Sequence, residues 1–366
     1  MDKKIFRKEL EKLNAYVPGK PIEDVMREYG LTRVVKLASN ENPLGPSPKA
    51  VAAVQAEAAR INIYPDPAVR VLREKLAAKH QVDFDQIMVG NGGESLIQLT
   101  AQSIISPGDE VITADPSFSL YEISVSHMGG TVHVVPLLAD TFQYDLEAML
   151  ALVNEKTKIV YICNPNNPTG TILGKTALDE FVDKLPEHVV LFLDEAYFEF
   201  ASAASKDYPD GLEILKRRPN TIVLRTFSKV AGIAGTRLGY IFSNPTMIAE
   251  IGKSTGVFSI NRLAQVAAAA AIEDDEHIEK SVALNKASLQ VFKDFFDAKG
   301  LNYVEPGGNF IWVDVKTDTH QLYIDLQKEG VIIRPGFLWG WDSWLRISSG
   351  NMQDTEICIE ALDKFL

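Results

Sequence analysis

The chain has 366 residues, and 49 acidic against 37 basic side chains give it a net charge of −12. At about 150 residues per domain, this length predicts roughly two domains. Hydrophobic residues make up 46% of the chain and charged residues 23%, which is typical of a folded globular protein and excludes a disordered chain. The acidic balance argues against general binding of nucleic acid, although one local arginine can still attract an anionic small molecule.

The counts of cysteine and histidine argue against a disulfide framework and against a metal site. The two cysteines, Cys163 and Cys358, lie far apart, and the six histidines contain no HExxH pair. The N-terminal residues 1–8 mix both charges and do not resemble a secretory signal, and no apolar stretch approaches the roughly 18 residues of a membrane span. We therefore expect a cytoplasmic protein that binds neither metal nor membrane.

Strand-like and helix-like segments alternate in the first two thirds of the chain. Helical patterns such as Ser95–Ile105 and Leu178–Leu185 separate several of the strand-like runs. The seven runs rich in β-branched residues are Ile87–Val89, Val111–Thr113, Val132–Val135, Ile159–Ile162, Val189–Leu193, Ile222–Leu224 and Leu238–Phe242. This alternation predicts an α/β domain with a mostly parallel seven-stranded sheet.

After about residue 260 the pattern changes. A long helical region over residues 262–299 is followed by strand-like runs at Asn309–Val315, Val331–Arg334 and Trp344–Ser348, with helices near residues 319–329 and at the end of the chain. This order predicts a smaller α+β domain.

Polar motifs follow two of the predicted strands. The segment Asn164–Gly170 has three Asn and two Pro in seven residues and predicts a turn after a strand. In Leu191–Tyr197 two acids, Asp194 and Glu195, end a buried strand, where a carboxylate is costly unless it meets a cation or a donor. A surface turn and a helix N-cap are the plain interpretations, but parallel sheets bind ligands at this edge.

Two further segments have the residue types of a phosphate site. Thr221–Lys229 is a strand that leads into hydroxyl groups and a lysine, and Arg237 follows eight residues later. Hydroxyls and a guanidinium suit a phosphate dianion, and a partly desolvated lysine could form a Schiff base. The small residues of Val89–Ser95 lie between a strand and a helix, where backbone N–H groups can approach a phosphate. Each segment alone is also compatible with ordinary surface structure.

In this order and spacing, the segments resemble the fold-type-I pyridoxal-phosphate aminotransferases, and most closely the histidinol-phosphate aminotransferase family. The resemblance covers nearly the whole chain and includes Leu37–Pro48, Tyr64–Asp66 and Trp344–Ile347. It implies an α/β fold of three parts: an N-terminal segment over residues 1–39 that packs with the small domain, a large α/β/α cofactor domain over residues 40–262 and a small α+β domain over residues 263–366. The implied cofactor is pyridoxal 5′-phosphate.

The resemblance also implies which residues carry the chemistry. Lys229 would bind the cofactor aldehyde and move the donor's α-proton, and Asp194 would keep the pyridinium nitrogen protonated. Tyr197 and Asn167 would hydrogen-bond the 3-oxygen of the ring. Phe118 would stack on the ring, although a place in the core is an equally good interpretation.

Other residues are implied to bind the phosphate and the substrate. The cofactor phosphate would be bound by Gly92, Gly93, Glu94, Thr226, Ser228 and Arg237, with Tyr64 reaching it from a neighbouring subunit, which implies a homodimer with shared active sites. The substrate would contact Tyr16, Asn42, Arg334 and Arg346, of which Arg346 matches the family position for the α-carboxylate.

The implied reaction transfers the amino group of L-histidinol phosphate to 2-oxoglutarate in histidine biosynthesis. Departures from the family pattern, such as the aromatic stretch Phe337–Trp341, leave substrate identity open. An aromatic amino-acid aminotransferase and a threonine-phosphate decarboxylase are the alternatives within this scaffold. A cofactor-fold protein that has lost its chemistry and acts as a regulatory module is the non-enzyme alternative.

Overall fold

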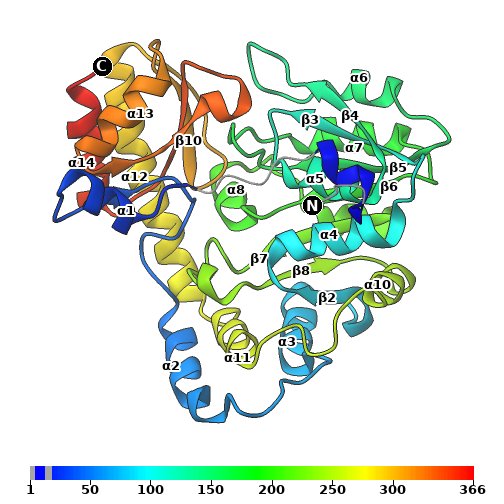
Figure 1. The fold of residues 1–366 in the computed structure, drawn as a ribbon. Coiled ribbons are helices and arrows are strands. Elements are labelled where there is room, and N and C mark those ends of the chain that lie inside the picture. Colours follow the sequence, from blue (N-terminus) through cyan, green and yellow to red (C-terminus); the bar gives the residue numbers. More distant parts are fainter. Residues whose placement is uncertain (1–4, 13–18) are drawn as a thin grey trace.

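A seven-stranded, mostly parallel β-sheet organises the larger part of the computed structural model, which describes residues 5–12 and 19–366 (Figure 1). From one edge to the other, its strands are β2 (Ile87–Gly90), β8 (Gly239–Phe242), β7 (Thr221–Thr226), β6 (Val190–Asp194), β5 (Thr157–Cys163), β3 (Glu110–Asp115) and β4 (Thr131–Pro136). Only β8 runs antiparallel to its neighbours β2 and β7 among these strands. Each strand overlaps one of the seven predicted runs, so the predicted sheet is confirmed.

The central strand β6 is buried along its whole length because helices cover both faces of the sheet. Leu191 and Leu193 pack with Phe181 of α7 (Lys175–Lys184) on one face, whereas Phe192 packs with Leu96 of α4 (Gly92–Ile104) on the other. This alternation follows from the two-residue period of a strand.

Helices lie between most successive strands of this sheet along the chain, whereas only the turn η5 separates β7 from β8 (Figure 1). The helices around the sheet are α2 (Pro48–Glu57), α3 (Arg70–His80), α4 (Gly92–Ile104), α5 (Leu120–Met128), α6 (Leu146–Ala151), α7 (Lys175–Lys184), α8 (Phe198–Ala204), α9 (Gly211–Arg217) and α10 (Pro245–Gly252), with short 3₁₀ turns η3 (Ala58–Arg60), η4 (Phe84–Gln86) and η5 (Ala234–Thr236).

Local sequence explains where several helices begin and end. At α2, Ser47 accepts a hydrogen bond from the N–H of Ala50, and Pro48 occupies the first helical position. The 25-residue helix α12 (Asp275–Lys299) ends where Gly300 adopts a φ of 63°, a left-handed conformation that glycine enters without a steric penalty.

A second, four-stranded sheet builds the smaller unit. Its strand order is β12 (Arg334–Pro335), β13 (Trp344–Ser348), β10 (Phe310–Asp314) and β9 (Asn302–Val304). Its apolar core contains residues of α12, α13 (Thr319–Lys328) and α14 (Met352–Asp363). The short turn η6 (Gly336–Trp339) connects β12 to β13. The sequence predicted this α+β unit but missed the short strand β9.

The N-terminal segment contacts both units. Helix α1 (Ile22–Tyr29) packs against α13, and β1 (Val35–Lys36) pairs in parallel with β11 (Val331–Ile332), as expected for a segment that packs with the small domain. The turn η2 (Lys8–Lys12), in contrast, packs against α5 beside the large sheet.

The predicted boundary at residue 262 precedes a helix that packs with the large unit. Helix α11 (Arg262–Ala271) lies against α2 and α3, because its run of alanines permits a close approach. The exact division into residues 40–262 and 263–366 stays a prediction. Among residues 5–12 and 19–366, no helix is long and apolar enough to cross a membrane.

Candidate active site

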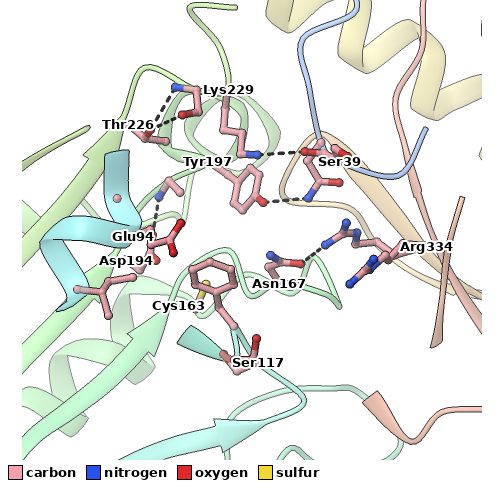
Figure 2. A pocket seen from close by; sticks show the side chains of 18 of the residues that line it. Ser39, Glu94, Ser117, Cys163, Asn167, Asp194, Tyr197, Thr226, Lys229 and Arg334 are labelled. Atoms are coloured by element: carbon pink, nitrogen blue, oxygen red, sulfur yellow. Dashed lines mark hydrogen bonds between the residues drawn. The ribbon is translucent and has the colours of Figure 1, made fainter. Parts of the chain in front are cut away.

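A cavity of about 650 Å³ opens at the carboxyl ends of β5, β6 and β7 (Figure 2). Its other wall comes from residues 38–40, from Arg346 of β13 and from the segment around Trp339. The large sheet and the smaller unit therefore both contribute to one site, at the edge of a parallel sheet where ligands bind.

Asp194 lies at the end of β6 and is 4% exposed. The Tyr121 hydroxyl donates to its Oδ2 at 2.8 Å, and the Ala196 N–H donates to its Oδ1 at 3.0 Å. Burial raises the pKa of Asp194, while both hydrogen bonds and the charge of Lys229 oppose the rise. Within the described chain no basic side chain lies within 4.0 Å of this carboxylate, so it retains the capacity to pair with a cation in the cavity.

Lys229 enters the same cavity from the loop that follows β7 (Figure 2). Its Nζ donates to the carbonyl oxygen of Ser39 at 3.3 Å. Desolvation lowers the pKa of Lys229 to about 8; the positive charges of Arg346 and Arg237 also lower it, against the attraction of Glu41 and Asp194. An amine with this pKa supplies an appreciable neutral, nucleophilic fraction near neutral pH.

The end of the cavity at the N-terminus of α4 has hydrogen-bond donors that suit an anion. The backbone turns into α4 at Gly92, whose φ of 83° favours glycine and where a Cβ would lie 2.8 Å from the guanidinium of Arg237. Gly93 and Glu94 at the start of α4 line the cavity, as do Arg237 and the hydroxyl residues Thr226 and Ser228. A 13-residue helix directs its first N–H groups and its positive dipole end here, which suits a phosphate dianion.

Three aromatic or amide side chains line the cavity between these charged groups. The Tyr197 hydroxyl accepts a hydrogen bond from Asn40 Nδ2 at 2.9 Å, and burial raises the pKa of this phenol. Asn167 uses its Oδ1 to accept a hydrogen bond from Arg346. The ring of Phe118 lies edge-on to Tyr121, with centroids 5.7 Å apart.

The wall formed by the smaller unit contains two arginines. Arg346 is 6% exposed and also donates to the carbonyl oxygen of Ala38 at 2.6 Å. Arg334 lies on the same side, and the indole of Trp339 has its centroid 5.5 Å from the Arg346 guanidinium carbon and 5.9 Å from that of Arg334. Two guanidiniums beside an aromatic ring form a second anion-binding wall, opposite the N-terminus of α4.

Three sequence-predicted site residues of the described chain, Gly92, Asn42 and Tyr64, do not line this cavity. Asn42 was expected to bind substrate, but its amide donates to the Val230 carbonyl at 2.7 Å and to Ser281 Oγ at 2.8 Å, so it supports the loop after Lys229. Tyr64 lies outside the cavity and is 75% exposed. Tyr16 lies outside the described residues.

Sequence reasoning also missed residues that the fold brings to the cavity or to the groups that line it. Tyr121 contacts Asp194 from α5, and Trp339 reaches the cavity from η6. The segment Pro116–Tyr121 and the aromatic stretch Phe337–Trp341 drew attention to both regions, but no local pattern identified which side chain enters the site.

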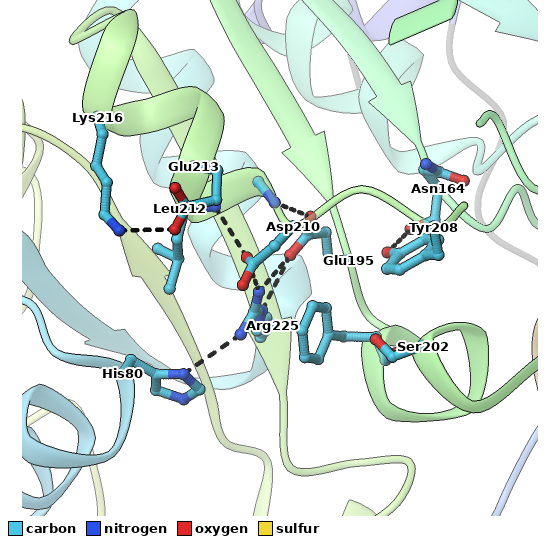
Figure 3. A network of polar contacts seen from close by, with 12 residues as sticks. His80, Asn164, Glu195, Ser202, Tyr208, Asp210, Leu212, Glu213, Lys216 and Arg225 are labelled. Atoms are coloured by element: carbon cyan, nitrogen blue, oxygen red, sulfur yellow. Dashed lines mark hydrogen bonds and ion pairs between the residues drawn. The ribbon is translucent and has the colours of Figure 1, made fainter. Parts of the chain in front are cut away.

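A buried ion-pair network contains Glu195, the residue that follows Asp194 (Figure 3). Arg225, 1% exposed, donates to Glu195 Oε2 at 2.8 and 3.0 Å and to Asp210 Oδ1 at 2.7 Å. Burial raises the pKa of Glu195 to about 7, although the positive charge of Arg225 lowers it. Burial alone would lower the pKa of Arg225, but the negative charges of Glu195 and Asp210 outweigh this effect and raise it. The network joins the end of β6 to the end of β7, which carry Asp194 and Thr226.

Comparisons with known proteins agree with this architecture. The family described as aminotransferase class I and II matches residues 32–362. A histidinol-phosphate aminotransferase of Moorella thermoacetica is 44% identical over 361 residues, covering 98% of this chain and 92% of the relative. Histidinol-phosphate aminotransferase 2 of Carboxydothermus hydrogenoformans is 45% identical over 347 residues, or 95% of each chain.

Among solved structures, the histidinol-phosphate aminotransferase of Sinorhizobium meliloti in complex with pyridoxal 5′-phosphate matches with a TM-score of 0.89 at 28% identity. The match covers 98% of this chain and 96% of that one. It confirms the fold class expected from the sequence. By fold and by sequence, the chain belongs to the aminotransferase class I and II family.

Proposed function

We propose that the protein is a pyridoxal-phosphate-dependent aminotransferase that transfers the amino group of L-histidinol phosphate to 2-oxoglutarate, forming imidazole-acetol phosphate and L-glutamate. One observation carries the proposal: the amine of Lys229 and the carboxylate of Asp194 line one cavity, together with Arg237 near the start of α4 and with Arg334 and Arg346 on the wall of the smaller unit. The names of the relatives described above support the same donor.

The cavity fits pyridoxal 5′-phosphate at each of its functional groups. The N-terminus of α4, with Arg237, Thr226 and Ser228, suits the phosphate. Asp194 would hold the proton on the ring nitrogen, and Tyr197 and Asn167 would hydrogen-bond the ring oxygen. Phe118 would pack on the ring face. Gly92 turns the backbone into α4 at a φ of 83°, a conformation that favours glycine, and so supports the N–H groups that would bind the phosphate.

Lys229 is the residue that would hold and return the proton. When bound, the cofactor supplies an electron sink that stabilises negative charge at the donor's α-carbon. The pKa of Lys229, about 8, lies close to neutral pH, where general base catalysis by Nζ is most efficient and contributes roughly 10²- to 10⁴-fold.

The second anion-binding wall explains how one site can accept two substrates. Arg346 and Arg334 would bind the phosphate of histidinol phosphate in one half-reaction and a carboxylate of glutamate in the other, since a guanidinium suits both anions. Trp339 lines the same wall and favours a second candidate, an aromatic amino acid, whose side chain could pack on the indole.

A second copy of the chain would complete the site. Tyr64 stacks on Phe258 with centroids 4.7 Å apart, and neighbouring Ile61 and Val257 are 68% and 78% exposed. Large apolar side chains gathered on a surface mark an interface. We therefore propose a homodimer in which Tyr64 reaches the partner's cofactor phosphate. Val257→Asp should give a monomer in sedimentation, while Ile324→Asp on α13 should stay dimeric; a dimeric Val257→Asp variant would contradict this interface.

The proposed setting is histidine biosynthesis in the cytoplasm. Cys163 and Cys358 are both buried free thiols, which agrees with a reducing compartment.

Steady-state transamination tests the proposed reaction. With 2-oxoglutarate as acceptor, glutamate should form with a much higher kcat/KM from histidinol phosphate than from phenylalanine. Lys229→Ala should lose turnover but still bind the cofactor. Lys286→Ala, at an exposed position on α12, should keep full turnover. Full activity of Lys229→Ala, or no transfer from any donor by the wild type, would contradict the proposal.

A further inference from the structure

We propose that Asn40 and Ser348 are positioning residues that connect the arginine-bearing strand β13 to the hydroxyl of Tyr197. This inference rests on the proposed function, because it concerns how Tyr197 addresses the cofactor oxygen. The three side chains form one hydrogen-bonded chain that we call the Asn40 relay.

Asn40 is held from both sides in a single orientation. It is 2% exposed and has a φ of 52°, a left-handed conformation that Asn tolerates better than most residues. Its Nδ2 donates to the Tyr197 hydroxyl oxygen at 2.9 Å, and its Oδ1 accepts from Ser348 Oγ at 2.8 Å. Its backbone N–H donates to the same Ser348 oxygen at 2.9 Å. These bonds fix which end of the amide faces Tyr197.

The direction of the bond to Tyr197 determines what the phenol can do. Because Asn40 donates, the Tyr197 oxygen accepts, and its own O–H must point elsewhere. Tyr197 lines the cavity, and burial raises the pKa of its phenol, so the hydroxyl keeps its proton at neutral pH. The relay therefore leaves the phenolic proton available to the cavity, where it can be donated to the cofactor oxygen.

The other end of the relay belongs to the strand that carries Arg346. Ser348 lies two residues after Arg346 on β13, and its N–H donates to the Leu37 carbonyl at 2.9 Å. Arg346 itself donates to the Ala38 carbonyl at 2.6 Å. Residues 37–40 are thus bound to β13 at several points. A displacement of β13 caused by an anion on Arg346 would be transmitted through Asn40 to Tyr197.

The relay predicts a spectroscopic effect in the holoenzyme. A hydrogen bond from Tyr197 to the cofactor oxygen stabilises negative charge there and so lowers the proton affinity of the lysine–cofactor chromophore. Asn40→Ala should raise that proton affinity roughly two- to tenfold, the effect of one modest hydrogen bond, measured as a shift in the absorbance titration. Asn40→Asp should raise it further, because a carboxylate accepts the Tyr197 proton and turns it away from the cofactor.

Matched variants separate the relay from a general structural effect. Ser348→Ala should shift the titration in the same direction. Ser349→Ala should not, because Ser349 is equally buried but its hydroxyl has no hydrogen-bond partner among the described residues. In a Tyr197→Phe background, Asn40→Ala should cause little further shift of the titration, because the effects of substitutions at two contacting residues do not add.

The possible results are distinguishable. An Asn40→Ala shift that persists undiminished in the Tyr197→Phe background, or identical titrations of wild type and Asn40→Ala, would overturn the relay while leaving the proposed reaction intact. A wild-type protein that forms no chromophore with pyridoxal phosphate would overturn both.

Discussion

Replacing Lys229 by Met should stabilise the cofactor-free protein at neutral pH, although it should abolish turnover. The lysine amine is held in a cavity at a pKa of about 8, whereas its ordinary value is 10.5. Below pH 8 the amine is charged in both the folded and the unfolded chain, and the fold carries the full cost of that charge. Since each pKa unit corresponds to about 1.4 kcal/mol, the fall from 10.5 to about 8 sets this cost at no more than about 3.5 kcal/mol.

Two features of the site reduce the gain in stability that we expect from Lys229→Met. The Lys229 side chain keeps some contact with the water of the cavity, and its removal leaves Asp194 without a nearby positive charge. We therefore expect Lys229→Met to raise the free energy of unfolding by about 1 to 3 kcal/mol at pH 7.

The pH dependence is the more specific signature. Between pH 8 and pH 10.5 the folded amine of the wild type loses its proton while the unfolded amine keeps it, so wild-type stability should rise with pH in this window. The advantage of Lys229→Met should shrink accordingly. Urea unfolding at pH 7 and pH 10, followed by circular dichroism, measures this difference, and Lys286→Met on the exposed side of α12 serves as the control. A stability difference that does not change with pH, or a variant less stable than the wild type at pH 7, would refute the reasoning.

Further substitutions test other parts of the site. Asp194→Asn should lower kcat by at least about 10²-fold with little change in unfolding, because a neutral amide cannot hold the ring proton by charge; wild-type turnover would remove Asp194 from this role. Arg346→Lys should raise the KM for the donor about 10- to 100-fold, since an ammonium cannot make paired bonds to the anion; an unchanged KM would exclude Arg346 from substrate binding. Glu195→Ala should lower the free energy of unfolding in urea by about 3–5 kcal/mol, because it leaves Arg225 buried without its main partner. Glu213→Ala, at an exposed ion pair, should change the free energy of unfolding by less than about 0.5 kcal/mol. Equal effects of the two substitutions would contradict the role of the buried network.

The strands of the large sheet and the position of the cavity could be predicted because both depend on local patterns. Runs of β-branched residues identified every strand of the large sheet, and polar motifs at their carboxyl ends placed Asn167, Asp194 and Lys229 at one edge. Parallel strands bring such ends together whatever the rest of the sequence does, so these residues share a cavity in the structure.

Local sequence patterns could not predict contacts between segments that lie far apart in the chain. Asn40 and Ser348 are 308 positions apart, and Tyr121 and Asp194 are 73 apart. Neither pair leaves a periodic signal in the sequence. The resemblance implied that Asn42 contacts substrate, whereas its amide hydrogen-bonds to the loop after Lys229, so a substrate contact of Asn42 stays a prediction.

Helix α11 illustrates the same limit for domain boundaries. The sequence placed it in one long helical region over residues 262–299, whereas in the structure α12 is a separate helix and α11 ends at Ala271. Which surface it would cover depended on α2 and α3, more than 180 residues earlier in the chain. Short strands such as β9, with three residues, were missed because they carry too little pattern.

A single half-reaction tests the central claim most directly. The purified holoenzyme would be mixed with histidinol phosphate or phenylalanine, without a keto acid, and the absorbance of the cofactor followed in a stopped-flow instrument. The account predicts rapid conversion to the pyridoxamine form by histidinol phosphate, at far higher efficiency than by phenylalanine. A stronger response to phenylalanine, or no conversion by either amine, would contradict it.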